Sequence, residues 1–294
     1  MAASKTPVVF IHGLWLHSSS WQPWAELFQA AGHPTYTPEW PGVPDTVEAA
    51  RAHPEAQAGK GLVEIIKAHA DFLLTLDEKP IIIGHSFGGL IVQSLMGESL
   101  GAAGVAIDPA QIRGVLPLPI AQLRSALPGL GNPLNYKKSV SLTEDQFRYG
   151  FANAVSEEES KELYDEWTIP SPARPLFEAA MANFNPHSPA KVHTHNNTRG
   201  PLLLISGRQD HTVPDVVTRS AYKLYKHSTA VTDLKQFDRG HSLTIDSGWR
   251  EIAQAALDWL ESHDLSGATA GGATSSAPAS IDLDAAAEQP ATDS

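Results

Sequence analysis

The chain has 294 residues, 42% of them hydrophobic, which is enough for one large α/β domain with an added segment. It contains no cysteine, which excludes disulfide bonds, thiolate metal sites and a cysteine nucleophile. The formal net charge of −12 argues against nucleic acid and against an anionic membrane as partners, because both would need a basic patch.

The first part of the chain alternates short apolar runs with segments of helical spacing. Val8 to Ile11 predicts a buried strand, and these four residues are too few for the core of a signal peptide. No apolar run approaches the length of a membrane span, so we expect a cytoplasmic protein. The further elements predicted here are a helix from Trp21 to Ala31 that stops at Gly32, a weak strand at Thr35 to Thr37, a helix from Leu62 to Leu76, a strand at Ile81 to Ile83 with a helix after it, and a strand at Val105 to Ile107.

The stretch from residue 110 to about 199 interrupts this alternation. It is rich in proline and has helical patterns but no convincing strand, so we expect a helical cap inserted over the active-site end of the sheet. Ser156 with Glu159 three residues later predicts a capping box that opens one of its helices. Most of the large apolar side chains of this segment are expected to form the core of the cap, with a few lining a pocket. They are Leu116, Leu118, Leu123, Leu127, Phe147, Phe151, Phe177, Met181 and Phe184.

The alternation returns in the last part of the chain. We expect strands at Leu202 to Ile205 and at Thr232 to Phe237, with a helix through Ala221 to Lys226 between them and a final helix through Trp259. Strands separated by helices predict a doubly wound, mostly parallel sheet. From Asp264 onward the composition predicts a disordered tail. The expected organisation is a core of residues 6–109 and 200–263, a cap of residues 110–199 and a tail of residues 264–294.

The segment Gly84-His85-Ser86-Phe87-Gly88 lies between an apolar strand and a helix. A chain that reverses this sharply pushes its central residue to positive φ, which is strained for any residue except glycine. Gly84 and Gly88 have no Cβ, so the start of the helix can pack closely on the end of the strand. This strand–turn–helix context is typical of a nucleophile elbow, and it indicates that Ser86 is a nucleophile.

A serine nucleophile needs a general base that a third group orients. Asp210 follows the Leu202 strand in a glycine-containing turn, and His241 follows the Thr232 strand directly after a glycine. The chain order Ser86, Asp210, His241 is the order expected for this elbow. Asp108, after the Val105 strand, is an alternative acid. Asp215 and Asp246 are expected to be surface or helix-cap residues.

The segments "FIHG", "GHSFGG", "GRQDHTVP" and "RGHS" resemble the α/β-hydrolase superfamily over roughly residues 6–263. The resemblance implies Ser86 as nucleophile, Asp210 as acid and His241 as base, with an oxyanion hole formed by the backbone N–H groups of Leu14 and Phe87. Few residues precede the first strand, so we expect about six parallel strands. This compact form is similar to the branch of hydroxynitrile lyases and plant methylesterases.

We therefore expect a serine hydrolase that cleaves carboxylic esters through an acyl-enzyme, without a cofactor. The expected partner is a small-molecule ester with an apolar acyl or alcohol part. Lactonase, thioesterase, C–C hydrolase or hydroxynitrile lyase activity on the same triad are alternatives, and so is a receptor that does not turn over its ligand. His193 and His195 form an H-x-H pattern without an evident third ligand, so no metal site is expected there.

Overall fold

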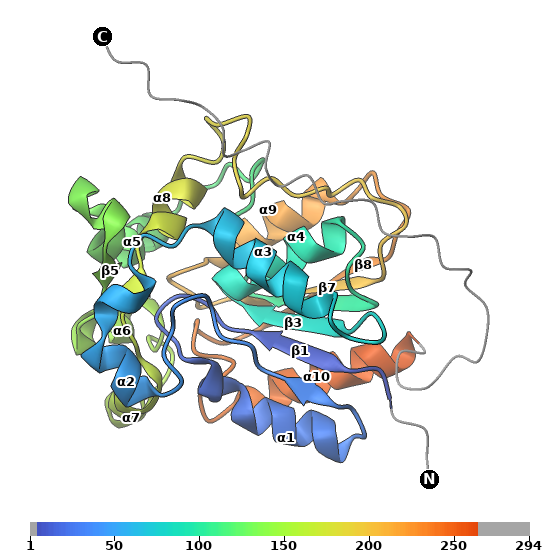
Figure 1. Ribbon diagram of the computed structural model, residues 1–294, viewed down its shortest axis with the longest axis horizontal. Coiled ribbons are helices and arrows are strands. Elements are labelled where there is room, and N and C mark those ends of the chain that lie inside the picture. The colour runs from blue at the N-terminus through green and yellow to red at the C-terminus, as the bar shows by residue number, and fades with distance from the viewer. Residues whose placement is uncertain (1–4, 264–294) are drawn as a thin grey trace.

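The computed structural model describes residues 5–263 (Figure 1). The predicted disordered tail, residues 264–294, lies outside the described residues. Over the part of the chain that is described, none of the helices combines the length and the apolar character that crossing a bilayer requires.

The centre of the molecule is a six-stranded parallel sheet with the strand order β2-β1-β3-β4-β7-β8. This confirms the predicted doubly wound sheet of about six strands. The strands are β1 (Val8–Ile11), β2 (Thr35–Tyr36), β3 (Ile81–His85), β4 (Ala103–Ile107), β7 (Leu202–Gly207) and β8 (Thr232–Phe237). Since all six are parallel, the loops that follow them emerge at the same edge of the sheet.

Helices cover both faces of the sheet (Figure 1). Inward side chains of α3, α4 and α9 pack on one face together with Val9 and Ile82, and those of α1 and α10 pack on the other with Phe10 and Ile83. Alternate residues of β1 and β3 thus belong to different cores, which is why these strands are apolar throughout. The helices outside residues 110–199 are η1 (Ser18–Trp21), α1 (Gln22–Ala30), α2 (Val47–Ala52), η2 (Pro54–Gln57), α3 (Leu62–Leu73), α4 (Phe87–Gly97), α9 (Asp215–Leu224) and α10 (Trp249–Ser262).

Residues 110–199, which we call the insert, leave the sheet after β4 and return at β7. Figure 1 shows its elements gathered at one end of the sheet, beside α2. They are α5 (Ile120–Leu130), η3 (Pro133–Lys137), β5 (Ser139–Val140), α6 (Glu144–Gly150), α7 (Glu157–Trp167), β6 (Ser171–Pro172) and α8 (Arg174–Ala180). The insert is mainly helical as expected, but β5 and β6 form a short antiparallel pair. The expectation of no strand was wrong because two-residue strands carry no periodic signal.

Two helices of the insert begin at side-chain caps. Ser156 Oγ accepts the Glu159 N–H at 3.1 Å, as predicted, but the Glu159 carboxylate accepts the Ser247 N–H instead of returning to Ser156. A complete capping box lies at the start of α6, where Thr143 and Gln146 bind each other's backbone N–H groups. The predicted box is therefore only half formed, because its glutamate connects the insert to the chain after β8.

Large apolar side chains of the insert divide into a buried and an exposed group. Phe147 and Phe151 are buried and Phe177 is partly buried. The remaining residues that the sequence assigned to the core of the cap are exposed, namely Leu116, Leu118, Leu123, Leu127, Met181 and Phe184. That assignment was wrong for these six. Hydrophobicity alone does not say which face of a short helix has a partner to pack against.

One arginine of the core binds the end of a helix of the insert. Arg51, from α2, donates to the carbonyl oxygens of Thr168 and Asp165, each at 2.8 Å, and to that of Tyr164 at 3.1 Å. These carbonyls lie at or just beyond the C-terminus of α7. The last carbonyl groups of a helix have no N–H partner within the helix, and the helix dipole favours a cation there. Arg51 thereby connects α2 to the insert.

Candidate active site

Ser86 lies between the end of β3 and the start of α4, with φ 58° and ψ −120°. The positive φ that the sequence predicted for this residue is confirmed. A Cβ on Gly84 would collide with the backbone of Gly88, and a Cβ on Gly88 would collide with the Ile11 carbonyl. Both glycines are therefore required by the packing of α4 against β1 and β3, and this packing holds Ser86 in a strained conformation.

Asp210 and His241 meet at the edge of the sheet where β7 and β8 end. His241 Nδ1 lies 2.5 Å from Asp210 Oδ2. The other oxygen, Asp210 Oδ1, accepts the backbone N–H groups of Thr212 at 2.6 Å and Val213 at 2.8 Å. Two backbone donors favour the ionised carboxylate, and the carboxylate in turn favours the tautomer in which His241 carries its proton on Nδ1.

The second ring nitrogen, His241 Nε2, is buried and has no hydrogen-bond partner among residues 5–263. The imidazole is held between two rings, that of Phe151 from the insert, with centroids 4.7 Å apart, and that of His85, with centroids 4.4 Å apart. His85 precedes Ser86 in the chain, so the structure places the imidazole beside the elbow. Burial, followed by the proximity of His241, lowers the pKa of His85 well below its ordinary value, and His85 is therefore neutral.

Asp108, the alternative acid, lies next to the same imidazole. Its Oδ1 accepts the Gly207 N–H at 2.6 Å, and its Oδ2 lies 4.0 Å from His241 Nδ1. Asp108 is completely buried, and Oδ2 has no partner within the described residues. Burial, followed by the charge of Asp210, raises the pKa of Asp108 well above its ordinary value. Burial therefore disfavours Asp108 as the anionic partner of His241, and Asp210, which hydrogen-bonds His241 Nδ1, remains the candidate acid.

Within residues 5–263, one group of three possible metal ligands lies close together. It consists of His85, Asp108 and His241, whose ligand atoms lie within 4.8 Å of one another. The Nδ1 atom of His241 already binds Asp210, so this group belongs to the hydrogen-bonded site described above. His193 and His195 are not part of such a group. His193 pairs with Glu98 at 3.0 Å on the surface.

The loop after β1 lies directly against the elbow. A Cβ on Gly13 would be 2.8 Å from Ser86 Cβ and 2.9 Å from the His85 carbonyl oxygen. Leu14 follows this glycine, and Phe87 is the first residue of α4, so its N–H has no acceptor within the helix. The absence of a side chain at Gly13 thus allows the loop that carries Leu14 to lie close to Ser86 and Phe87.

Contacts with the insert position this loop, and sequence reasoning did not anticipate them. The Trp15 backbone N–H donates to Ser171 Oγ at 2.7 Å, and its indole N–H donates to the Val140 carbonyl at 2.9 Å. Trp15 itself has φ 66°. Because β5 and β6 supply both acceptors, the short antiparallel pair of the insert fixes the backbone that follows Leu14.

Glu39 contacts two histidines of the loop that follows β1. Its carboxylate lies 3.1 Å from His12 Nε2 and 3.0 Å from His17 Nε2. Burial opposes ionisation of Glu39, but hydrogen bonds with His12 and Ser18 outweigh it, and the pKa of Glu39 is lowered. Glu39 thereby fixes His12 and His17, which flank Leu14 in the chain.

The two remaining acids of the sequence analysis lie outside this group. Asp215 is the first residue of α9 and binds Ser206 and Arg219. Asp246 was expected at the surface or at a helix cap, but it is buried and accepts from Ser242 Oγ at 2.9 Å. The sequence could not predict this burial, because it depends on contacts between the loop after β8 and the insert, such as the hydrogen bond from the Ser247 N–H to Glu159.

Comparison with known proteins agrees with this architecture. The model of the alpha/beta hydrolase family matches residues 8–255, so the chain belongs to that family. A search of curated proteins by sequence gave no match.

Many solved structures are similar to this chain, including the following three. A monoacylglycerol lipase from Paleococcus ferrophilus is 23% identical with a TM-score of 0.62, over 88% of this chain and 97% of its own. An extracellular alpha/beta-hydrolase from a Paenibacillus species is 18% identical with a TM-score of 0.61, over 86% and 98%. A methylesterase from Arabidopsis is 17% identical with a TM-score of 0.57, over 87% and 99%. At these identities the likeness establishes the fold.

Proposed function

We propose that the protein is a serine hydrolase that cleaves carboxylic esters through an acyl-enzyme. The observation that carries this proposal is the buried Asp210–His241 pair beside a serine held at positive φ. A strained serine next to an imidazole with a free, buried Nε2 is suited to nucleophilic attack and has no evident use in packing.

In the proposed mechanism Ser86 Oγ attacks the ester carbonyl while His241 Nε2 takes the hydroxyl proton. The negative charge that develops on the carbonyl oxygen is stabilised by the N–H groups of Leu14 and Phe87. His241 then passes the proton to the leaving alcohol as the C–O bond breaks. A water molecule, deprotonated by the same imidazole, hydrolyses the acyl-enzyme and regenerates Ser86. Asp210 holds the imidazole tautomer and stabilises the imidazolium.

The insert acts as a cap in this proposal. Ser86, Asp210 and His241 are each at most 3% exposed, and Phe151 packs on the imidazole. A substrate must therefore enter beneath the insert, and a low-dielectric surrounding strengthens the interactions with the developing charge. The esterase and lipase names of the similar structures agree with an ester as substrate.

The test combines active-site labelling with turnover. The protein is mixed with a slight excess of a fluorophosphonate, and separately with repeated additions of a short-chain chromogenic ester. We expect stoichiometric labelling of Ser86, located by peptide mass spectrometry, and many turnovers per molecule. Absence of labelling, or a single turnover followed by arrest, would refute the proposal and favour a receptor that retains its ligand.

A further inference from the structure

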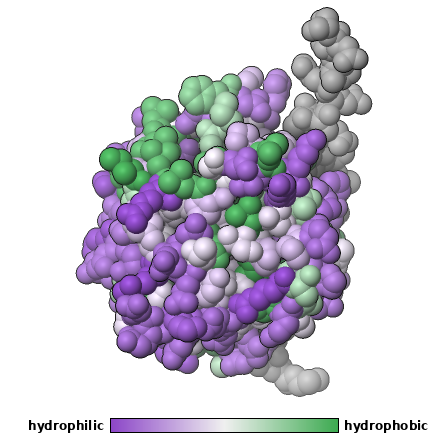
Figure 2. All heavy atoms as spheres, turned by 90° about the vertical axis from the view of Figure 1, so that its left-hand side faces the viewer, coloured by the Kyte–Doolittle hydropathy of each residue, from purple (hydrophilic) through white to green (hydrophobic). Residues whose placement is uncertain are grey.

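Seven large apolar side chains of the insert are more than half exposed. They are Leu116, Leu118, Ile120, Leu127, Leu134, Met181 and Phe184. Figure 2 shows hydrophobic side chains gathered over one part of the face that the insert presents. Monomeric proteins seldom expose several neighbouring apolar side chains without a use for them, because each costs free energy of hydration.

These side chains come from segments that the fold brings together. Helix α5 contacts both η3 and α8. The chain after α8 returns to the start of the insert, where Asn183 accepts the Gly114 N–H and donates to the Val115 carbonyl, each at 2.7 Å. Phe184 and Leu116 therefore flank the same connection, and the exposed residues form one surface, which we call the apolar face.

The two sequence segments that supply the apolar face are basic, whereas the chain as a whole is acidic. No acidic residue occurs between Asp108 and Glu144 or between Glu178 and Asp210, and these two segments hold seven of the 21 basic residues. All 33 acidic residues lie elsewhere. The overall charge of −12 had argued against an anionic membrane as a partner. Five of the seven basic residues belong to the parts of the insert that also supply the apolar face, namely Arg113, Arg124, Lys137, Lys138 and Lys191.

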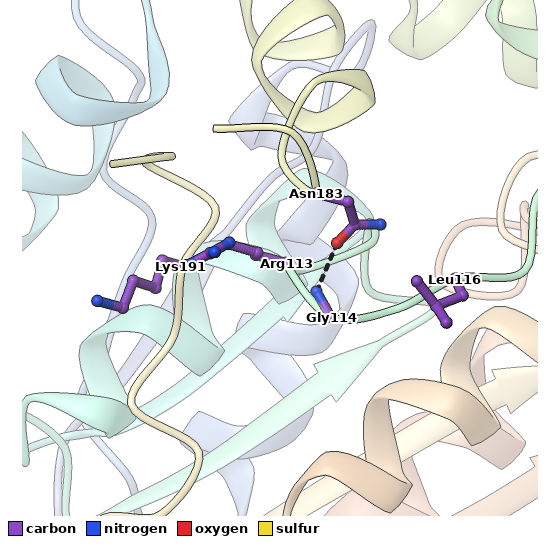
Figure 3. Close-up of a pocket in the computed structure, with 5 residues that line it drawn as sticks. All are labelled: Arg113, Gly114, Leu116, Asn183 and Lys191. Carbon is purple, nitrogen blue, oxygen red and sulfur yellow. Dashed lines mark hydrogen bonds between the residues drawn. The ribbon is translucent and has the colours of Figure 1, made fainter. Parts of the chain in front are cut away.

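A small pocket joins the apolar and the basic parts of this surface. It has a volume of about 400 Å³ and is lined by Arg113, Gly114, Leu116, Asn183 and Lys191. Figure 3 shows Arg113 and Lys191 on one side of the pocket and Leu116 on the other, with the Asn183–Gly114 hydrogen bond between them. Neither cation forms an ion pair with another described residue. A phosphate group seated here would meet two cations while hydrocarbon lay against Leu116.

We propose that the apolar face docks onto a lipid surface that carries anionic phosphate headgroups. Apolar side chains enter the boundary of the acyl region, and basic residues beside them bind headgroup phosphates, which is the combination that peripheral membrane proteins use. A second copy of the chain suits the face less well. A two-fold interface would place the same cations opposite one another.

The docking surface is connected to the candidate active site. Ser125, on the inner side of α5, hydrogen-bonds Thr212 at 2.7 Å, and the Thr212 N–H binds the carboxylate of Asp210. Docking would therefore place the lipid surface one helix away from the acid loop. If the proposed ester hydrolysis is correct, this favours substrates dissolved in the lipid phase.

The experiment measures sedimentation of the full chain with vesicles of phosphatidylcholine, with and without phosphatidylglycerol. We expect binding to the mixed vesicles that weakens as salt rises from about 0.1 M to about 1 M, and little binding to phosphatidylcholine alone. The double variant Ile120→Ser/Phe184→Ser should bind the mixed vesicles at least tenfold more weakly. Arg113→Gln/Lys191→Gln should bind more weakly and lose most of the salt dependence.

A matched control removes exposed apolar side chains that lie outside the apolar face. Leu74 and Val231 are 53% and 47% exposed, and Leu74→Ser/Val231→Ser should bind vesicles as the natural chain does. Equal binding to both kinds of vesicle, or no binding to either, would overturn the proposal. So would a dimer that Ile120→Ser/Phe184→Ser converts to a monomer, because a second copy would then cover the face.

Vesicle binding and ester hydrolysis can be tested independently of each other. Ser86→Ala should bind vesicles as strongly as the natural chain, because Ser86 takes no part in docking. Ile120→Ser/Phe184→Ser should keep the rate on a water-soluble short-chain ester, because neither residue touches the candidate site. Vesicle binding without esterase activity would refute the proposed function alone.

Discussion

Asp108 Oδ2 lies 4.0 Å from His241 Nδ1, the nitrogen that is already hydrogen-bonded to Asp210. Two buried carboxyl groups thus converge on one imidazole. They cannot both be ionised without strong repulsion in a site of low dielectric. Burial, followed by the charge of Asp210, raises the pKa of Asp108, so Asp108 is the carboxyl group of the two that burial disfavours as an anion.

This relationship predicts unequal effects of two similar substitutions. Asp108→Asn keeps an acceptor for the Gly207 N–H and leaves the Asp210–His241 contact in place, so kcat/KM for an activated ester should stay within a few-fold of the natural value. Asp210→Asn favours the wrong imidazole tautomer and should lose about 10³- to 10⁴-fold. Steady-state kinetics of both variants provide the check. Collapse in Asp108→Asn with near-normal turnover in Asp210→Asn would reverse the assignment of the acid.

The protonation of Asp108 also makes stability depend on pH. Above pH 3.8, the ordinary value of the group, the unfolded chain releases a proton that the folded chain keeps, so this residue lowers stability as the pH rises. Asparagine cannot release that proton. Asp108→Asn should therefore gain stability relative to the natural chain between pH 4 and pH 7, as measured by urea unfolding. A stability difference that does not change with pH would show that Asp108 is ionised in the fold.

Ser86 and His241 should act as a unit. Ser86→Ala and His241→Ala should each lose on the order of 10⁴-fold or more in kcat, and the double variant should lose little beyond that, because either change already removes the nucleophile–base pair. Losses that multiply in the double variant would indicate independent roles and contradict the proposed mechanism.

His69 should weaken the fold at acid pH. It is completely buried in α3, donates from Nδ1 to the Ile65 carbonyl at 2.8 Å, and burial lowers its pKa to about 4. As the pH falls below 6.5 the unfolded chain takes up a proton that the folded chain does not, so stability is lost down to about pH 4. His69→Leu should therefore gain about 2 kcal/mol over the natural chain between pH 7 and pH 5.

Urea unfolding at the two pH values measures this gain. His187→Leu is the control, because His187 is exposed and its environment changes little on unfolding. An equal gain in both variants would mean that burial of His69 is not its cause.

Arg51 should hold the insert to α2. Arg51→Met keeps an apolar stem but removes the charged hydrogen bonds to the carbonyls of Thr168 and Asp165, and it should cost about 2 to 3 kcal/mol. Lys67→Met, which breaks an exposed pair with Asp71, should cost less than about 0.5 kcal/mol. Unfolding free energies of both variants test this expectation. Equal small costs would mean that water replaces Arg51 at these carbonyls.

Local patterns in the sequence determined much of the core. The apolar run at Ile81 and the glycines around Ser86 predicted the strand, the sharp turn and the positive φ, because these features depend on a few neighbouring residues. The candidate residues Ser86, Asp210 and His241 could be found for a related reason. Each follows a strand, and parallel strands bring all such loops to one edge of the sheet.

Tertiary structure alone decided the features that depend on contacts between distant segments. Both Asp108 and Asp210 were candidate acids in the sequence. Only the packing of β4 against β7 shows that Asp108 is buried beside the same imidazole, where burial raises its pKa. The bond between Trp15 and Ser171 joins residues far apart in the chain, and no periodicity predicts it. The exposure of Leu116 and Phe184 was misjudged for the same physical reason. Burial of a hydrophobic side chain is favourable, but whether it is buried depends on whether the fold places another segment against it.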